Sequence, residues 1–239
     1  NFYNNNCIIY GRGINGFKFK KNITLNAGNS GTVGRLILPL LIRSPYKIRI
    51  IGDKSLSKRD FSRVIRPLNE IGAKFYPENR GKLPISIIGS DYLRPINYYE
   101  KRGSAQCKTC VMLASLNTPG EMRIFAKKSR NHTELMFKEL KIPIKIKNKK
   151  NFNFIKTSRP ARLSKFNLNI PGDISSASFF IALALLSEKS QLRLKNINLN
   201  PSRLGILKIL RKMGANIILK NMKILKGERR GDIYVKSDK

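Results

Sequence analysis

Hydrophobic and polar positions along the chain follow the same order three times. A small polar segment leads into an apolar helix pattern, a polar turn and an alternating strand pattern. A loop with serine and basic residues, an amphipathic helix pattern and a further strand pattern then follow. Gly31, Gly103 and Gly172 mark the three copies, 72 and 69 residues apart. This period exceeds that of solenoid repeats, so each copy is predicted to be a small βαβαββ subdomain of an α/β (α+β) protein.

The segment from Gly103 to Leu116 predicts a helix whose first turn is available to an anion. A glycine and small polar residues run directly into a long apolar stretch. The first amides of a helix lack internal acceptors and lie at the positive end of its dipole. Ser104 and Gln106 add a hydroxyl and an amide beside them. An ordinary buried helix with a small-residue start explains the same segment, and only its repetition favours the binding interpretation.

The beginning of the chain leads into the equivalent helix of the first copy. Residues 7–19 are predicted to form two strands around a glycine turn. Asn29 or Ser30 is predicted to cap the helix, and Gly31 allows a ligand to approach the backbone closely. Gly34 costs helix stability, so we interpret it as a site of close packing.

Basic side chains gather before the next helix of the first copy. Ser57 and Asp60 are predicted to form a capping arrangement there. Lys54, Lys58 and Arg59 oppose the helix dipole at the same place, a conflict that a bound anion would remove. Arg59 is therefore predicted to hold a carboxylate or a phosphate with two parallel N–H groups.

The corresponding loop of the second copy carries Ser129 and Arg130, which are predicted to face the same cleft. Asn131 and Glu134 are predicted to form a capping box at the helix that follows. His132 in the first turn is interpreted as a structural residue rather than a general base. In the third copy, the proline of the segment Asn-Pro-Ser-Arg predicts a helix start.

The charge of the chain is the most prominent feature of its composition. The 239 residues carry a formal net charge of +34, which is typical of nucleic-acid binders, and 41% of them are hydrophobic, enough for a core. The lysines are spread along strands and helices, with no separate basic tail. We therefore favour a compositional bias over a selected polyanion partner, and expect neither a nucleic-acid nor a membrane partner. Small anionic substrates would still be steered by this field.

Three cysteines, an odd number, argue against a disulfide framework and for a reducing compartment. Cys107 and Cys110 have Cys-x-x-Cys spacing, but a zinc site would need two more ligands, and the sequence holds one histidine and no second cysteine pair. Both cysteines are interpreted as small buried hydrophobes, and no metal site is expected. The longest apolar runs, 36–42 and 179–186, are far shorter than the roughly 18 residues of a membrane span.

Six ordered segments together closely resemble one enzyme family. They read Leu-Asn-Ala-Gly-Asn-Ser-Gly-Thr from residue 25, Gly-Asp-Lys-Ser-Leu-Ser-Lys-Arg from 52, Gly-Ser-Ala-Gln-Cys-Lys from 103, Ser-Arg-Asn-His-Thr-Glu from 129, Pro-Gly-Asp-Ile-Ser-Ser-Ala from 171 and Asn-Pro-Ser-Arg from 200. From about residue 8 onward, the chain is similar to the 5-enolpyruvylshikimate-3-phosphate (EPSP) synthases, the 3-phosphoshikimate 1-carboxyvinyltransferases. The enzymes that transfer enolpyruvate to UDP-N-acetylglucosamine share the fold, but the segments around Ser104 and Ser129 resemble the shikimate enzymes.

This resemblance implies an inside-out α/β barrel of two domains, each with three βαβαββ units. Residues 1–170 would form the first domain, incomplete at its N-terminus, and residues 171–239 the first unit of the second domain. The boundary and hinge would lie at Pro171-Gly172. The implied reaction transfers the enolpyruvyl group of phosphoenolpyruvate to the 5-hydroxyl of shikimate 3-phosphate and releases phosphate, a step of chorismate and aromatic amino-acid biosynthesis. The resemblance also implies no metal or organic cofactor, a cytoplasmic location and a monomer at full length.

The resemblance assigns binding residues position by position. Shikimate 3-phosphate would be held by Ser104, Ala105, Gln106, Ser129 and Arg130. Phosphoenolpyruvate would be held by Asn29, Gly31 and Arg59, with Gln106 shared. These assignments match helix starts and an arginine that organise two anions. Arg35 and Asp173 are predicted to form an ion pair when the domains close, with local capping and surface charge as the alternative.

Parts of the family pattern are missing from this sequence. An N-terminal Lys-Ser and Arg motif would precede Asn1, and the acid and base residues and the remaining phosphoenolpyruvate clamp would follow Lys239. We therefore expect a fragment without turnover of its own, which product formation by the chain would contradict. Asp60 replaces a usual proline, and Val33-Gly34 replaces a usual threonine and methionine, without changing a predicted ligand.

Two other function classes remain open at this point. RNA 3′-terminal phosphate cyclases are built from related units, but they need a histidine nucleophile, and His132 lies at a helix start. A basic RNA-binding protein without enzymatic activity would explain the charge, but the basic segments lack stacking aromatics and the chain has no Trp. Steep salt dependence of binding would favour nucleic acid, and competition by phosphate analogues would favour the enzyme.

Overall fold

The computed structural model describes residues 2–3, 6–14 and 16–237, which belong to two compact units. The first unit comprises Asn1–Ser129 and Leu140–Lys165, and the second comprises Arg130–Glu139 and Phe166–Lys239. The chain therefore passes from one unit to the other directly after Ser129. The division into domains after residue 170 stays a prediction.

The first two copies have the predicted βαβαββ order. Each forms a four-stranded sheet in which the first two strands are parallel and the other neighbours antiparallel, with strand orders β3-β4-β6-β5 and β7-β8-β10-β9. The first copy contains β3 (Ile23–Asn26), α1 (Gly31–Leu36), η1 (Leu38–Leu40), β4 (Ile48–Ile51), η2 (Leu56–Lys58), α2 (Ser62–Ile71), β5 (Lys74–Asn79) and β6 (Lys82–Ile88). The second contains β7 (Asn97–Glu100), α3 (Ala105–Ala114), β8 (Glu121–Lys127), α4 (His132–Glu139), β9 (Ile144–Asn148) and β10 (Phe152–Ser158).

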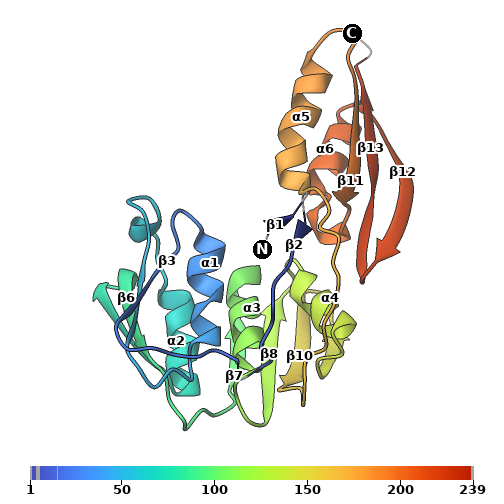
Figure 1. Ribbon diagram of the computed structural model, residues 1–239. Helices are drawn as coiled ribbons and strands as arrows, with labels where there is room; N and C mark the ends of the chain where they lie inside the picture. Colours follow the sequence, from blue (N-terminus) through green and yellow to red (C-terminus); the bar gives the residue numbers. More distant parts are fainter. Residues whose placement is uncertain (1, 4–5, 15, 238–239) are drawn as a thin grey trace. The chain divides into compact units, whose positions relative to one another are not determined.

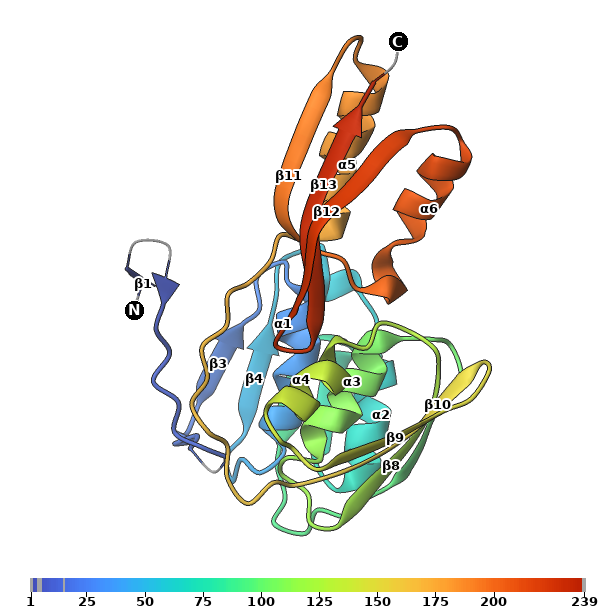
Figure 2. The same ribbon diagram turned by 90° about the vertical axis from the view of Figure 1, so that its right-hand side faces the viewer.

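The third copy keeps the same strand order with its first strand reduced to one residue. Gly172 makes an isolated parallel bridge to Ile197 of β11, where the other copies have a full parallel strand. The remaining strands follow the order β11-β13-β12, with the helices on one face of the sheet (Figure 2). The copy contains α5 (Ile174–Leu186), β11 (Gln191–Asn198), η3 (Pro201–Arg203), α6 (Gly205–Lys212), β12 (Asn216–Leu225) and β13 (Glu228–Lys236).

Two tight turns close hairpins at equivalent places in the first and third copies. Arg80 and Gly81 join β5 to β6, and Lys226 and Gly227 join β12 to β13, all with positive φ. Two consecutive residues with positive φ produce the turn whose twist matches a right-handed hairpin, and glycine adopts this conformation without strain. Local turn chemistry thus sets the register of both hairpins.

The core of the first unit lies between its sheets and three helices. Helices α1, α2 and α3 lie side by side (Figure 1), and α3 contacts both of the others. Gly34 permits this packing, because a Cβ there would lie 3.3 Å from the ring of Phe61. The strands contribute alternate apolar side chains to this core. Fully buried members include Ile48, Ile50, Val64, Leu68, Ile85, Ile87, Cys110, Val111, Met112, Ile124 and Ile155.

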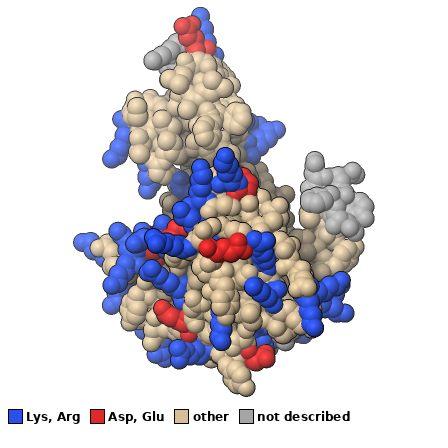
Figure 3. Space-filling model, turned by 90° about the vertical axis from the view of Figure 1, so that its left-hand side faces the viewer, with Lys and Arg blue, Asp and Glu red and all other residues tan. Residues whose placement is uncertain are grey.

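The second unit has its own core and an exposed apolar helix face. Ile181 and Ile233 are fully buried between α5 and the sheet. On the other side of α5, Phe179 and Leu186 are 79% and 80% exposed, and Phe180 and Leu183 accompany them. Figure 3 shows the corresponding surface, at the top of the view, as largely free of charged side chains.

Several local predictions were wrong. A hairpin forms at β1 (Phe2–Tyr3) and β2 (Asn6–Cys7), but residues 8–14 and 16–19 contain no strand. Ser57 does not cap α2, since its hydroxyl donates to the carbonyl of Gly52 at 3.3 Å. The three glycines are not equivalent either, because Gly31 is the first residue of α1, whereas Gly103 and Gly172 precede the caps of their helices. The predicted fold class itself is confirmed: the chain is a mixed α/β protein of repeated βαβαββ units, whose sheets are open within the described residues.

Candidate functional site

Two guanidinium groups meet at the start of α1. A Cβ on Gly31 would lie 3.2 Å from Nη1 of Arg35 and 3.2 Å from Nη1 of Arg59. Arg35 reaches this place because it follows Gly31 by one helical turn, and Arg59 comes from the end of η2. Among the residues that the structure describes, the side chain of Arg59 makes no ion pair or hydrogen bond. The glycine therefore leaves space beside two cations.

Arg35 is held in this position by three neighbours. Its Nη1 donates to Oε1 of Gln106 at 2.9 Å, its Nη2 donates to the carbonyl oxygen of Asp60 at 3.1 Å, and its guanidinium lies 5.0 Å from the ring centre of Phe61. Burial lowers the pKa of Arg35, and the neighbouring charge of Arg59 lowers it further. The cations at this site repel one another, and an anion between them would relieve that repulsion.

The loop before α1 is fixed by a carboxylate. Ser30 caps the helix, as predicted, by accepting from the amide of Val33 at 3.1 Å. Nδ2 of Asn29 donates to Oδ2 of Asp53, and Oδ1 of Asp53 accepts from the amide of Leu56 at 2.7 Å. These hydrogen bonds lower the pKa of Asp53, so it stays a carboxylate. The side-chain amide of Asn29 is thereby oriented beside the start of α1.

The start of α3 has the predicted form of an anion site. Ser104 is the N-cap, and its hydroxyl accepts from the amide of Cys107 at 3.3 Å. The buried Glu100 accepts from the amide of Gly103 at 2.6 Å, and Gly103 has a φ of +74°. The amides of Ala105 and Gln106 have no acceptor inside the helix, as at any helix start. These two donors and the Ser104 hydroxyl remain at the open end of α3.

Ser129 lies in the loop that approaches α3. A Cβ on Gly103 would lie 3.6 Å from the carbonyl oxygen of Lys128. The hydroxyl of Ser129 is buried and has no hydrogen-bond partner among the described residues. A buried hydroxyl without a partner is costly, which favours a ligand atom beside it. Arg130, the next residue, is exposed.

Gln106 connects the two helix starts. Its Oε1 accepts from Arg35, and its Nε2 donates to Oγ1 of Thr32 at 3.3 Å. Thr32 and Arg35 belong to α1, and Gln106 is the second residue of α3. One side chain therefore joins α1, which begins at the predicted phosphoenolpyruvate residue Gly31, to the start of α3 with the predicted shikimate 3-phosphate residues.

Comparisons with known proteins identify the family of this chain. The family model described as EPSP synthase (3-phosphoshikimate 1-carboxyvinyltransferase) covers residues 2–236. The chain belongs to the EPSP synthase family. A 3-phosphoshikimate 1-carboxyvinyltransferase of Vesicomyosocius okutanii is 43% identical over 97% of this chain and 52% of its own length. One of Oenococcus oeni is 39% identical over 98% of this chain and 53% of its own length.

The fold comparison agrees with the sequence comparison. The structure of an EPSP synthase from Acinetobacter baumannii superposes with a TM-score of 0.81 and 34% identity, over 95% of this chain and 50% of that one. The chain thus spans about half the length of the EPSP synthases it matches. The RNA-binding and RNA cyclase alternatives receive no support from these matches.

Several residues of this candidate site were not singled out as ligands or supports from the sequence. Arg35 was assigned only to a closure pair, and Thr32 and Asp53 were assigned no role. The spacing of four residues between Gly31 and Arg35 could have indicated that both lie on one helix face. Asp53 gave no such signal, because its contact with Asn29 spans 24 residues.

The predicted ion pair of Arg35 and Asp173 stays a prediction. Arg35 contacts Gln106 in the first unit, whereas Asp173 pairs with Nη2 of Arg203 at 2.8 Å in the second. Asp173 also caps α5 by accepting from the amide of Ser176 at 3.2 Å. Each residue therefore has a partner within its own unit.

The cysteines near the candidate site are structural. Cys107 and Cys110 are free thiols with 5% and 0% exposure, as expected for small buried hydrophobes. Burial raises the pKa of the Cys110 thiol well above its usual value, so it stays protonated. Within residues 2–3, 6–14 and 16–237, no group of three or more acidic, histidine or cysteine side chains is arranged to hold a metal.

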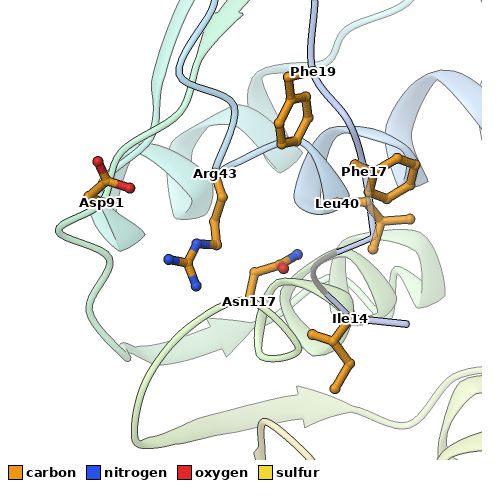
Figure 4. Close-up of a pocket in the computed structure, with 7 residues that line it drawn as sticks. All are labelled: Ile14, Phe17, Phe19, Leu40, Arg43, Asp91 and Asn117. Carbon is orange, nitrogen blue, oxygen red and sulfur yellow. The ribbon is translucent and has the colours of Figure 1, made fainter. Parts of the chain in front are cut away.

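A pocket elsewhere in the first unit is separate from the candidate site. It has a volume of about 190 Å³, and Arg43 and Asn117 extend toward its centre (Figure 4). None of the predicted substrate-binding residues lines it. Its lining consists of Ile14, Phe17, Phe19, Leu40, Arg43, Asp91 and Asn117.

Basic side chains are not gathered at one place on the face shown in Figure 3. Lys and Arg side chains lie over much of this face, with acidic side chains between them. The compositional bias stays a prediction. Every helix in the described part of the chain is too short or too polar to cross a bilayer.

Proposed function

We propose that this chain takes part in the transfer of the enolpyruvyl group from phosphoenolpyruvate to the 5-hydroxyl of shikimate 3-phosphate, with release of phosphate. One observation carries the proposal. Gln106 hydrogen-bonds with Arg35 at 2.9 Å, which joins an anion site of two guanidinium groups to a second helix start with free donors. A reaction between two anionic substrates needs two such sites side by side.

Shikimate 3-phosphate is assigned to the start of α3. The hydroxyl of Ser104 and the amides of Ala105 and Gln106 would donate to its phosphate. Ser129 supports this assignment, since its buried hydroxyl lacks a partner that a phosphate oxygen would supply. Arg130 follows directly and would add a positive charge.

Phosphoenolpyruvate is assigned to the start of α1. Arg59 would bind one of its anionic groups beside Gly31, where no side chain fills the space. Asn29, oriented by Asp53, would donate a further hydrogen bond. Gln106 would contact both substrates, because it already bridges the two helices.

These residues would promote the reaction by positioning and electrostatics. Holding both anions in fixed places replaces a repulsive encounter in water with an oriented pair of reactants. Preorganised donors would also stabilise charge on the phosphate that leaves. We assign no proton transfer to a residue of this chain. The cytoplasmic location and the monomeric state are part of the same proposal.

Isothermal titration calorimetry tests the assignment of the two substrates. We expect Ser104→Ala to weaken binding of shikimate 3-phosphate roughly tenfold, because it removes a hydrogen bond to a charged group. Arg59→Ala is expected to change that affinity less than about twofold, but to weaken phosphoenolpyruvate binding, measured with shikimate 3-phosphate present, by roughly 10- to 100-fold.

Arg63→Ala is the matched control for Arg59, since Arg63 is a nearby exposed arginine that already lies 3.9 Å from Asp60. It is expected to leave both affinities unchanged. Absence of saturable binding of shikimate 3-phosphate by the folded chain would contradict the proposed function. Equal losses in the Arg59 and Arg63 variants would indicate a general charge effect and remove the assignment of Arg59.

A further inference from the structure

Helix α4 begins two residues after Arg130, one of the predicted phosphate-binding residues. Although α4 stands in the second copy, it lies in the second unit, against the turn between β12 and β13. A Cβ on Gly227 in this turn would lie 3.6 Å from Cβ of Leu135. At the other end of the helix, Nζ of Lys226 lies 3.1 Å from a carboxylate oxygen of Glu139.

Glu228, the first residue of β13, contacts the start of α4 directly through Oε1 and indirectly, through Asn200, with Oε2. Its Oε1 is hydrogen-bonded with Nδ1 of His132. Its Oε2 accepts from Nδ2 of Asn200 at 3.2 Å, and the same amide nitrogen donates to Oδ1 of Asn131 at 2.9 Å. Nδ2 of Asn198 also donates to Oε2, at 3.3 Å. Glu228 thus contacts His132 directly, and it shares the side-chain amide of Asn200 with Asn131.

The environment of Glu228 keeps it ionised and in place. Burial raises its pKa, but hydrogen bonds from His132 and Asn200 lower it by more, so the pKa lies below its usual value. Asn200 is only 2% exposed and is itself fixed, because its Oδ1 accepts from the amide of Ser202 at 3.0 Å. A negative charge near a helix start is also favoured by the helix dipole.

We propose that Glu228 is a positioning residue for shikimate 3-phosphate binding, which acts by fixing His132 and, through Asn200, Asn131, the two residues that follow Arg130. This inference rests on the proposed function. A loop that is already ordered binds its ligand without the entropic cost of becoming ordered. The guanidinium group of Arg130 must also lie within about 3 Å of a phosphate oxygen to donate a hydrogen bond, so a small displacement of its backbone would remove the contact.

The variant Glu228→Gln in the 239-residue chain tests this role. The amide nitrogen of Gln would face the donating Nδ2 of Asn200, which disrupts the network with little change in volume. We expect affinity for shikimate 3-phosphate to fall roughly tenfold, measured by calorimetry, while affinity for unphosphorylated shikimate falls less than about twofold. The ratio of the two affinities reports on the phosphate contacts alone. A general loss of stability would not change this ratio.

Glu139→Gln is the matched control, because it removes the other ion pair between α4 and the same hairpin. This variant is expected to leave the affinity ratio unchanged. Amide hydrogen exchange gives a second measurement on the unaltered protein, in which shikimate 3-phosphate is expected to slow exchange at residues 130–135 as well as at 104–107. Glu228→Gln is expected to speed exchange at 130–135 in the free chain.

The possible outcomes separate the two proposals. An unchanged affinity ratio in Glu228→Gln, or ligand protection limited to 104–107, would overturn the positioning role and leave the proposed function standing. Equal effects of Glu228→Gln and Glu139→Gln would indicate a merely structural contact and would also overturn it. Failure of the unaltered chain to bind shikimate 3-phosphate would overturn the proposed function and this role with it.

Discussion

The first and third copies both place an arginine beside a helix start. Only the third copy pairs this arginine with a carboxylate. In the third copy, the cap of α5 is Asp173, which lies 2.8 Å from Nη2 of Arg203. In the first copy, the cap of α1 is Ser30, and Arg59 beside it makes no ion pair within the described residues. The third copy therefore supplies a carboxylate of its own to the arginine. The first copy leaves space there for the anionic group of a ligand.

This difference indicates which feature distinguishes the candidate binding site at the start of α1 from the equivalent start of α5. Both helices have a side-chain cap and both loops supply an arginine, so neither feature distinguishes them. The charge of the capping residue distinguishes them, because an aspartate pairs with the guanidinium group that a serine leaves available. Exchanging the caps between the copies is thus the most direct way to test the comparison.

The largest effect is expected from Ser30→Asp. Aspartate caps helices as well as serine does, so α1 should remain intact. Its carboxylate is expected to pair with Arg59, as Asp173 does with Arg203, and to repel phosphoenolpyruvate. We expect phosphoenolpyruvate affinity to fall by roughly 100-fold in calorimetry, given two charge-assisted interactions lost or reversed.

Ser30→Asn is the control for this substitution, since it keeps a capping oxygen without a charge. It is expected to retain affinity within about threefold. If both variants lost binding equally, the geometry of the cap rather than its charge would matter, and the comparison between the copies would lose its meaning.

A smaller effect is expected from Gly31→Ala. The new Cβ would lie 3.2 Å from both guanidinium groups, which are the flexible ends of long side chains, so the fold should persist. Alanine also has a higher helix propensity by up to about 1 kcal/mol. We expect an unchanged or raised melting temperature together with roughly tenfold weaker phosphoenolpyruvate binding, because the methyl group occupies the ligand's space. Gain of stability without loss of binding would show that the space beside Gly31 is not used.

The smallest effect is expected from Asp173→Asn in the third copy. Asparagine keeps the helix cap but removes the ion pair with Arg203, so the loss should stay below about 1 kcal/mol at neutral pH. Burial raises the pKa of Asp173, but hydrogen bonds from Ser176 and the charge of Arg203 lower it overall. A lowered folded-state pKa contributes stability above the unfolded value, and that contribution is lost as pH falls.

Thermal unfolding at two pH values measures this contribution. At pH 7 we expect the unaltered chain to melt at a higher temperature than Asp173→Asn. This difference should disappear as pH falls through the lowered pKa of Asp173. A difference that persisted at pH 2 would show that the ion pair is not its source.

Features set by neighbouring residues could be predicted from the sequence. Ser30 and Ser104 cap their helices, and the asparagine and proline of the third copy start η3, because each depends on residues at most three positions apart. The repeat was visible because sheet and helix periodicities are themselves local patterns. Ser57 was misassigned because several nearby side chains could satisfy the same amides, and the sequence does not rank them.

Features set by distant residues could not be predicted in this way. The hydrogen bond between Arg35 and Gln106 joins positions 71 residues apart, and no local pattern marks it. Residues 8–14 and 16–19 have alternating apolar positions but form no strand, since a strand also needs an edge to pair with. The substrate-binding assignments remain predictions that rest on the family resemblance.

The attachment of α4 to the third copy has a consequence for how the protein folds during synthesis. His132 and its partner Glu228 are 96 residues apart, and the ribosome needs roughly 5 to 20 s to synthesise that length. During this time α4 is already made, but the hairpin that holds its first turn does not yet exist. The second copy is therefore completed only after the third, although it precedes it in the chain.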